Sequence, residues 1–324
     1  MSEVVVVTGA TSGVGRAVAL RFARDGAKVA LLARSREGLA GAVRDVEAAG
    51  GTALALPTDV AEFDQVDAAA AAVEEAFGPI DVWINNAMTT VFAYFEDVEP
   101  KEFRRATEVT YLGTVWGTQA ALKRMQKRDR GTIVLVGSAL AKRGIPLQSA
   151  YCGAKHGIQG FFESLRCELR HKGSNVHVTS VHLPALNTPQ FDHGRTKMPK
   201  QPMPVPPIFQ PEVAADAVHW AAHHRRRELY VGAPTCWTIW GSQLAPWFAE
   251  WYLAKTGVKA QQTEPSIEPR DGNLFEAETE DPGSHGRFDD RAHARSAQLV
   301  LAKHRGAVAL GLAAAAGVVA AARR

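Results

Sequence analysis

The chain is poor in cysteine, and its few cysteines lack the spacing of a disulfide framework or a metal site. Cys152, Cys167 and Cys236 are the three cysteines among 324 residues. Disulfide-stapled domains carry larger, closely spaced sets of cysteines, and zinc sites need paired cysteines or histidines. We therefore expect no bound metal, no structural disulfide and a reducing compartment.

A strong charge of either sign and a secretory leader are also missing. The 37 Lys and Arg against 34 Asp and Glu give a net charge of +3. This balance gives no reason to expect nucleic acid as a partner, and no basic stripe with interleaved aromatics is present. The N-terminus runs into an apolar strand at Glu3, without the charged and apolar regions of a signal peptide. We expect a cytoplasmic protein that acts on a small molecule.

Short apolar runs alternate with helical patterns through the first 183 residues. The runs predict strands at Val4–Val7, Lys28–Ala33, Thr52–Leu56, Asp81–Asn85, Thr132–Gly137 and Val176–Leu183. Helices are expected at Gly13–Asp25, Glu37–Ala49, Glu62–Phe77, across Lys101–Arg128 and at Ser149–His171. This alternation is typical of an α/β fold, a Rossmann-type doubly wound parallel sheet with helices on both faces.

The chain changes character after residue 183. Pro184–Pro211 is too rich in proline for a long helix or a central strand, so we expect an irregular segment with room for one short helix, which covers the site. A helix at Pro211–His224 and a strand at Glu228–Val231 follow. We assign residues 1–255 to one catalytic domain, with the substrate loop at about 184–211.

Beyond this domain we expect a C-terminal extension in two parts. Residues 256–295 are polar and acidic-leaning, which predicts a linker. Residues 296–324 contain the apolar stretch Gly306–Ala322, about 25 Å long as a helix, which is short for a hydrocarbon core of roughly 30 Å. The stretch is compatible with a weak membrane tail, with a helix docked on protein, or with a dimer contact.

A glycine-rich turn follows the first predicted strand and opens the first predicted helix. It reads Thr8-Gly-Ala-Thr-Ser-Gly-Val-Gly15. Glycines allow a tight turn and a close approach of backbone to a pyrophosphate, which the helix N-terminus then stabilises. In this strand–turn–helix setting the motif predicts dinucleotide binding rather than a simple packing turn.

Tyr151 and Lys155 lie four residues apart in a predicted helix, with Ser138 upstream at a strand end. Residues at this spacing share one helix face. A lysine beside a tyrosine favours the phenolate, so we expect Lys155 to lower the tyrosine pKa from roughly 10. Such a tyrosine can act as a proton donor or acceptor.

The ordered set Thr-Gly-x-x-x-Gly-x-Gly, Asn-Asn-Ala, Ser and Tyr-x-x-x-Lys resembles the short-chain dehydrogenase/reductase family over about residues 3–232. The resemblance implies hydride transfer between a nicotinamide cofactor and a carbonyl/alcohol substrate. It implies that Ser138 binds the substrate oxygen, Tyr151 exchanges the proton and Lys155 holds the nicotinamide ribose. Taken singly, Ser138 and also Asp59 have an alternative interpretation as local caps.

The resemblance also implies a cofactor site. Gly9, Gly13 and Gly15 would hold the diphosphate, Asp59 the adenine and Thr188 the carboxamide, with Asn86 steadying a strand end. The full implied cofactor set is Gly9, Thr11, Ser12, Gly13, Val14, Gly15, Arg34, Ser35, Asp59, Val60, Asn86, Ala87, Tyr151, Lys155, Pro184 and Thr188.

The tip of the second predicted strand carries Arg34 and Ser35, and no acidic residue. A carboxylate at this point selects NAD, whereas an arginine suits a 2′-phosphate. We therefore predict NADP as the cofactor, with NAD less favoured. A solvated arginine at a helix start is the alternative.

Three positions depart from the family pattern. Met88 replaces the glycine after Asn-Asn-Ala, Thr110 stands where the catalytic asparagine is expected, and Ala185 replaces a glycine after Pro184. We include Thr110 among the candidate catalytic residues, although the proton relay through it is in doubt. The departures leave open a second function, a cofactor-binding scaffold or redox sensor.

Four tryptophans lie close together near the end of the catalytic domain. They are Trp237, Trp240, Trp247 and Trp251. They are compatible with core or dimer packing, with an apolar substrate mouth, or with a membrane interface. With the apolar C-terminal stretch, they favour a lipophilic substrate, and we expect a homo-oligomer.

Overall fold

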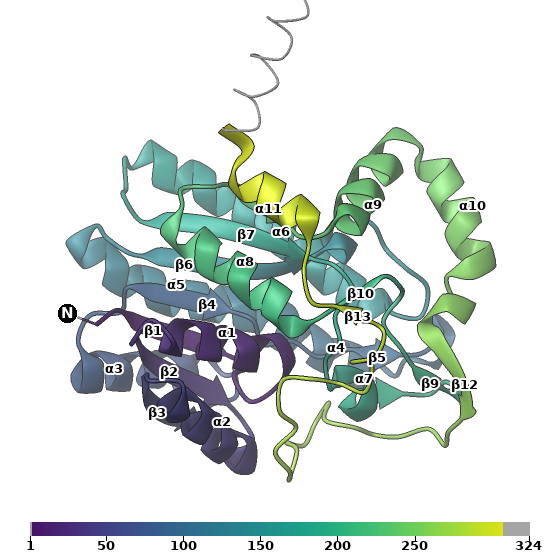
Figure 1. Cartoon of the computed structure of the whole chain (residues 1–324), viewed down its shortest axis with the longest axis horizontal. Coiled ribbons are helices and arrows are strands. Elements are labelled where there is room, and N and C mark those ends of the chain that lie inside the picture. Colours follow the sequence, from purple (N-terminus) through teal and green to yellow (C-terminus); the bar gives the residue numbers. More distant parts are fainter. Residues whose placement is uncertain (1, 307–324) are drawn as a thin grey trace, which may run out of the picture.

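Seven parallel strands form the central sheet of the computed structural model, which describes residues 2–306 (Figure 1). The strand order is β11-β7-β6-β4-β1-β2-β3, and every pairing is parallel. The strands are β1 (Val4–Thr8), β2 (Lys28–Ala33), β3 (Thr52–Pro57), β4 (Val82–Asn85), β6 (Thr132–Ser138), β7 (His177–Leu183) and β11 (Glu228–Tyr230).

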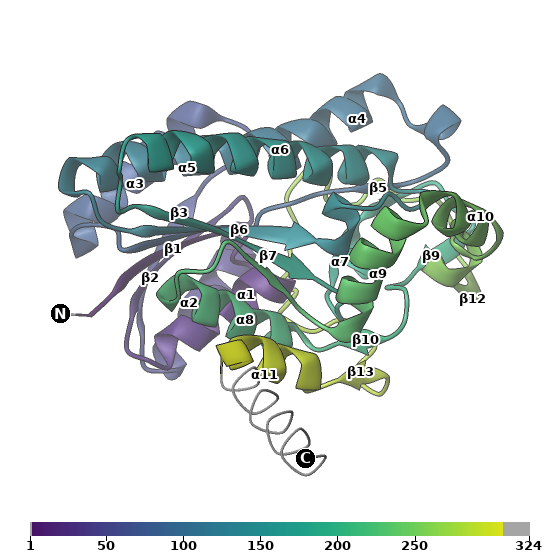
Figure 2. The same ribbon diagram turned by 90° about the horizontal axis from the view of Figure 1, so that it is seen from above.

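Helices cover both faces of this sheet (Figure 2). One face carries α1 (Gly13–Ala23), α2 (Arg36–Ala48) and α8 (Pro211–His223), and the other carries α3 (Phe63–Phe77), α5 (Gly113–Met125) and α6 (Ser149–His171). Successive strand residues point to opposite faces. Val5 and Val7 therefore join the core under α1 and α8, whereas Val4 and Val6 join the core under α3 and α5. The predicted doubly wound α/β fold is confirmed.

The sheet reverses its direction of growth between β1 and β4. From β1 the chain adds β2 and β3 on one side, and β4, β6, β7 and β11 on the other. Ligands of open α/β sheets bind at such a switch point, outside the carboxyl ends of the strands. Thr8, Asn85 and Ser138 are the last residues of β1, β4 and β6, so all three lie at this edge.

The two helical stretches expected across Lys101–Arg128 are continuous with each other, joined by a π-helical turn. The run comprises α4 (Pro100–Thr107), the π-turn η2 (Glu108–Leu112), α5, and the short 3-10 turn η3 (Gln126–Arg128). The π-turn contains Thr110. π-turns are rare and are frequent at functional sites.

The proline-rich segment that follows β7 contains one short helix and three short strands. They are α7 (Gln190–His193), β8 (Arg195–Thr196), β9 (Lys200–Pro202) and β10 (Ile208–Phe209). β8 pairs with β5 (Val91–Phe92), which follows β4. Phe92, Phe191 and Met198 form part of a small separate core. The segment thus packs over the carboxyl edge of the sheet, as the sequence suggested.

The remaining elements follow β11 or lie in turns. They are α9 (Ala233–Leu244), α10 (Pro246–Thr256), β12 (Gln262–Ser266), β13 (Ala292–His293), α11 (Ala297–Lys303) and the 3-10 turns η1 (Phe95–Asp97), η4 (Ala139–Ala141) and η5 (Lys259–Gln261). Figure 1 shows α9 and α10 as a helical hairpin at one end of the molecule.

The linker predicted for residues 256–295 is packed on the domain, so this interpretation is corrected. β12 pairs with β9, and β13 pairs with β10. Leu274 is fully buried and Phe288 nearly so. The segment is polar because its contacts are hydrogen bonds and ion pairs made to the cleft, and such contacts leave no periodic apolar signal in the sequence.

Among residues 2–306, no helix combines the length and the apolar character needed to span a bilayer. α11 ends at Lys303, at the beginning of the predicted C-terminal helix. Residues 307–324, and with them nearly all of the apolar stretch considered as a membrane tail, lie outside the described residues.

Candidate active site

The glycine turn connects β1 to α1 and faces the switch point. Gly9 has φ +65°, and a Cβ there would lie 2.8 Å from the Cα of Ala87. α1 begins at Gly13, and the Ser12 side chain makes no capping hydrogen bond to it. Gly15 lies beneath the turn, where a Cβ would come within 2.1 Å of the Gly9 carbonyl oxygen. The turn therefore offers a cradle of close backbone at a helix N-terminus, which suits a diphosphate.

Asn86 joins the turn to the end of β4. Its amide nitrogen Nδ2 donates to the carbonyl oxygens of Thr8 at 3.0 Å and Gly9 at 3.2 Å. The Thr8 hydroxyl accepts from the backbone amides of Asn86 and Ala87. These bonds fix the two strand ends that flank the switch point.

Ser138, Tyr151 and Lys155 come together at the end of β6 and the start of α6. Lys155 is 3% exposed, and its Nζ donates to the Val136 carbonyl oxygen at 2.7 Å and lies 5.5 Å from the centroid of the Tyr151 ring. The Ser138 hydroxyl also accepts from the Leu140 amide at 3.1 Å, which is the capping contact expected from its place after a strand. All three side chains line one cleft.

The pKa values of this pair differ from the prediction. Burial raises the pKa of Tyr151, an effect opposed in part by a hydrogen bond with Ser138. Burial also lowers the pKa of Lys155 to about 8. The expectation that Lys155 lowers the pKa of Tyr151 is therefore corrected, because burial disfavours the charged phenolate and so raises the pKa.

A buried histidine contacts the backbone of Ser138. His182 in β7 is fully buried; its Nδ1 lies 3.1 Å from the Ser138 carbonyl oxygen and its Nε2 lies 3.1 Å from Glu228 Oε1. Lys142 is 3.4 Å from the same carboxylate. Sequence reasoning did not find this histidine, because a lone histidine in a strand carries no motif.

Thr110 is in the π-turn and does not line the cleft. Its side chain is fully buried; the hydroxyl accepts from the Thr89 amide at 3.0 Å and donates to the Thr89 carbonyl at 2.9 Å. It ties the helical run to the loop after Asn86. With both bonds made to backbone, the hydroxyl has a structural role in this geometry.

Arg34 and Asp59 lie at the tips of the strands on the β2 side. The Arg34 guanidinium donates to the carbonyl oxygens of Asn273, Phe275 and Glu276. Asp59 pairs with Arg105 at 2.5 Å and accepts from the Ala61 amide, a local turn contact. Both Arg34 and Asp59 line the cleft.

The cleft that these residues share has a volume of about 540 Å³. Every predicted site residue except Gly15 and Thr110 lines it: Gly9, Thr11, Ser12, Gly13, Val14, Arg34, Ser35, Asp59, Val60, Asn86, Ala87, Ser138, Tyr151, Lys155, Pro184 and Thr188. Met88 and Ala185, two of the departures from the family pattern, also line it. The glycine cradle and the strand-end polar groups fit a dinucleotide.

The cleft has further walls that the sequence did not indicate. Asn273, Ala277, Glu278 and Pro282 line it from the C-terminal segment, and Thr238, Tyr252 and Leu253 from the α9–α10 hairpin. Leu274 and Phe288, two apolar residues inside a polar stretch, were the sequence signals of a docked segment, and both are buried.

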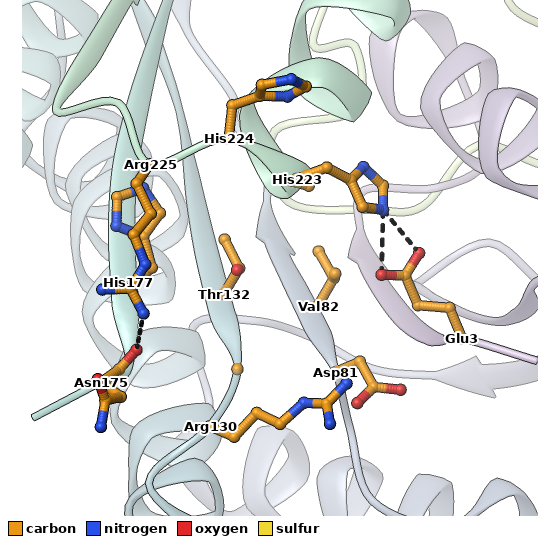
Figure 3. Close-up of a pocket in the computed structure, with 12 residues that line it drawn as sticks. Glu3, Asp81, Val82, Arg130, Thr132, Asn175, His177, His223, His224 and Arg225 are labelled. Carbon is orange, nitrogen blue, oxygen red and sulfur yellow. Dashed lines mark hydrogen bonds and ion pairs between the residues drawn. The ribbon is translucent and has the colours of Figure 1, made fainter. Parts of the chain in front are cut away.

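A second cavity, of about 350 Å³, lies at the amino ends of the strands, opposite the cleft (Figure 3). His177, His223, Arg130 and Arg225 line it near the amino ends of the strands, and His223 bonds to Glu3. Burial, with nearby arginines, lowers the pKa of His177 to about 4. No predicted site residue lines this cavity, and we assign no chemistry to it. Among residues 2–306, no group of three His, Cys, Asp or Glu side chains could hold a metal ion.

Comparison with known proteins gives related sequences over most of the chain. Residues 3–198 match the family described as short chain dehydrogenase. The uncharacterized oxidoreductase YxnA of Bacillus subtilis (strain 168) is 32% identical over 297 residues, which are 91% of this chain and 83% of that protein. The 3-dehydrosphinganine reductase of Danio rerio is 34% identical over 199 residues, which are 60% of this chain and 59% of that protein.

Solved structures with the same fold carry dinucleotides. An alcohol dehydrogenase from the archaeon Thermococcus sibiricus, complexed with 5-hydroxy-NADP, superposes with a TM-score of 0.62 at 25% identity. A short chain dehydrogenase from Mycobacterium paratuberculosis, bound to NAD, superposes with a TM-score of 0.61, also at 25% identity. Each match covers 71% of this chain and 96% of the other.

Proposed function

Since the chain belongs to the short-chain dehydrogenase family, we propose that it is an NADP(H)-dependent oxidoreductase that interconverts a lipophilic carbonyl compound and its alcohol. The main observation behind this proposal is that Ser138, Tyr151 and Lys155 line the same cleft as the glycine turn and Arg34. Proton-transfer groups and a dinucleotide cradle are thereby within reach of the same small molecule.

The chain's own residues divide the work of a carbonyl reduction. The bound nicotinamide supplies the hydride. Tyr151 donates its proton to the substrate oxygen; its raised pKa keeps the hydroxyl protonated, so the proton is present for donation. Ser138 donates a hydrogen bond to the same oxygen and stabilises the charge that develops there. Lys155, anchored on the Val136 carbonyl, holds the ribose side of the cofactor.

Arg34 supports NADP over NAD. Its guanidinium is the cationic group at the tip of β2, where the ribose of the adenosine is expected. Three backbone carbonyls already orient this side chain, so little conformational entropy would be lost on binding a 2′-phosphate. Related structures carry either an NADP analogue or NAD, so they do not favour one cofactor. The proposal of NADP therefore rests on Arg34 as a partner for the 2′-phosphate.

The lipophilic substrate is supported by the surface around the mouth of the cleft. α10 has no buried residue, and both helices of the hairpin carry exposed aromatics, with Trp237 on α9 74% and Trp247 on α10 72% exposed. Exposed large apolar side chains here are Trp237, Trp240, Leu244, Trp247, Phe248, Trp251 and Tyr252. A cluster of exposed large apolar side chains marks a contact with a partner or with lipid. We propose that it serves a second copy of the chain or a bilayer surface, next to the opening through which substrate enters.

Tyr151→Phe tests the catalytic assignment. Purified protein is assayed for NADPH oxidation with a panel of aldehydes, ketones and quinones of increasing chain length. We expect turnover by the wild type, and a loss of about 10²–10⁴-fold in the variant because the proton donor is gone. The dissociation constant for NADPH should change by less than about three-fold, since the phenol ring remains.

The same assay separates the second candidate function. Met88 in the cleft and the engaged hydroxyl of Thr110 favour a cofactor-binding scaffold or redox sensor. Tight NADPH binding with no turnover of any panel member, in wild type and variant alike, would support the scaffold and contradict the reductase.

A further inference from the structure

Residues 273–288, here called the strap, cross the cofactor cleft from its β2 side to its β7 side. Figure 1 shows this stretch between β12 and β13, passing the ends of α2 and α1. On the β2 side the strap supplies the three carbonyls that hold the Arg34 guanidinium. Its Leu274 is fully buried, and the Leu274 carbonyl accepts from Arg105, the partner of Asp59.

In its middle the strap is attached to the glycine turn. The Gly13 amide donates to the Gly283 carbonyl at 3.0 Å. Arg16, 2% exposed, bonds to Asp281 at 3.0 Å and to Asp45 of α2 at 2.7 Å. α2 accommodates Asp281 through Gly41, where a Cβ would lie 1.8 Å from the Asp281 carboxylate.

On the β7 side the strap is attached to the loop that carries Thr188. The Phe288 amide donates to the Asn187 side chain at 3.0 Å, and the Gly286 amide donates to the Asn187 carbonyl at 3.3 Å. Asn187 is fully buried and Phe288 is 4% exposed. The two ends and the middle of the strap are thus bonded to residues on both sides of the cleft.

The strap is a wall of the cleft and does not fill it. Asn273, Ala277, Glu278 and Pro282 line the same space as Gly9, and the cleft keeps its volume of about 540 Å³ beneath them. Glu278, the carboxylate in this set, is paired with His193 at 3.0 Å.

We propose that the strap closes over the bound dinucleotide and sets its rate of release. The inference rests on the proposed NADP(H) function and adds a structural element to it: the strap pre-orders Arg34 and covers the diphosphate cradle at Gly13. Opening requires the Asp281–Arg16 pair and the bonds of Asn187 to break, so release is slower than it would be from an open cleft.

Asp281→Asn in the full-length chain loosens the middle attachment. Arg16 keeps its pair with Asp45, so the domain retains its buried ion pair. We expect NADPH release, followed by stopped-flow fluorescence, to become about 10-fold faster, with little change in the association rate. Asp290→Asn is the matched control, because Asp290 lies two residues beyond the strap and is exposed to solvent. It should leave release unchanged.

Gly41→Ala is the second variant, in case Asp281→Asn lowers stability. The added methyl displaces the Asp281 carboxylate, while alanine is favoured over glycine in a helix interior. We expect the same faster release. A readout independent of activity is hydrogen exchange: NADPH should slow the exchange of amides 273–288 in the wild type, and less so in Gly41→Ala.

The outcomes distinguish the strap from the function on which it rests. A wild type that binds neither NADPH nor NADH overturns both proposals. Binding with equal release rates in wild type, Asp281→Asn and Gly41→Ala, and with no protection of the strap amides, overturns the strap alone. Faster association and tighter binding in the variants would mean that the strap obstructs the site, which also contradicts the proposal.

Discussion

Burial moves Tyr151 and Lys155 toward their neutral forms. The pKa of the phenol is raised and that of the ammonium is lowered to about 8. A buried lysine near neutrality costs stability whenever it carries charge, since its charged form is desolvated. Its pKa therefore gives a prediction about unfolding that is separate from any assay of turnover.

The folded pKa of Lys155 lies below the ordinary value of 10.5. Between pH 8 and about 9.5 the unfolded chain therefore binds more protons than the folded one, and the free energy of unfolding rises with pH. We expect Lys155 to contribute a rise of up to about 2 kcal/mol over this window. Urea denaturation of wild type and Lys155→Met at both pH values measures it as the difference between the two proteins.

The window stops at pH 9.5 for a reason. Tyr151 has a raised pKa, so its stabilising contribution is lost only as the pH rises past the unfolded value near 10. Equal pH dependence in wild type and Lys155→Met would show that Lys155 is not desolvated as described.

Glu228 makes a prediction about the support of Ser138. Burial acts to raise its pKa, but His182 and the nearby basic side chains lower it to about 2. Its stabilising contribution is thus present above pH 4.5 and is lost as the pH falls toward 2. We expect Glu228→Gln to lower the free energy of unfolding at pH 7 by about 1–2 kcal/mol, discounted for partial solvent screening.

The same variant should affect turnover through His182, which holds the Ser138 carbonyl. We expect a lower kcat with the NADPH dissociation constant unchanged, because Glu228 does not line the cleft. Glu163→Gln is the control, since Glu163 bonds the adjacent Arg227 on the surface. A loss of stability without any change in kcat would reduce His182 to a packing role.

At the scale of elements, α10 departs from the rule that helices bury an apolar face. α10 buries no residue, although Trp247, Phe248 and Trp251 lie on it. Because exposed side chains contribute little to folding, we expect Trp247→Ser with Trp251→Ser to change the free energy of unfolding by less than about 1 kcal/mol.

Light scattering and flotation with lipid vesicles then identify what the hairpin contacts. We expect the double variant to lose self-association or vesicle binding, whichever the wild type has. A large drop in unfolding free energy instead would mean that the tryptophans are packed in the fold.

Regular elements with strong periodicity were predictable. α6 was expected at Ser149–His171 and β2 at Lys28–Ala33, and both have these bounds. Local patterns determine such elements, since β-branched runs form buried strands and apolar spacing forms helices. The strap was not predictable, because its position depends on ion pairs and carbonyl contacts with residues more than 200 positions away.

In the candidate site, too, the motif residues were predictable and the features that depend on long-range contacts were not. Motif residues such as Gly9, Ser138 and Tyr151 were placed together by the fold, as the order of strand ends implied. The direction of the pKa shift of Tyr151 was not predictable from the sequence, because desolvation depends on the side chains that surround the phenol. The bonds of Thr110 to Thr89 likewise depend on a π-turn, for which the sequence carries no propensity signal.

For the whole molecule, cofactor preference appears as a change in thermal stability. A ligand at 100 times its dissociation constant stabilises the folded state by about 2.7 kcal/mol. In a chain of this size each kcal/mol raises Tm by about 2–4 °C. We therefore expect a rise of roughly 5–10 °C with saturating NADPH and a smaller one with equal NADH, measured by calorimetry. Arg34→Ala should remove the difference, and a larger shift with NADH would contradict the NADP assignment.

The pair between Arg16 and Asp281 joins residues 265 positions apart. During synthesis, the glycine turn leaves the ribosome long before the strap does, at a rate of about 5–20 residues per second. The sheet can form while the cofactor cleft still has one wall missing. β11 ends at Tyr230 and the strap follows at residues 273–288, so at this rate the nascent domain would bind and release dinucleotide freely for several seconds. With the closure proposed above, retention of the cofactor is the last property that this chain acquires as it is made.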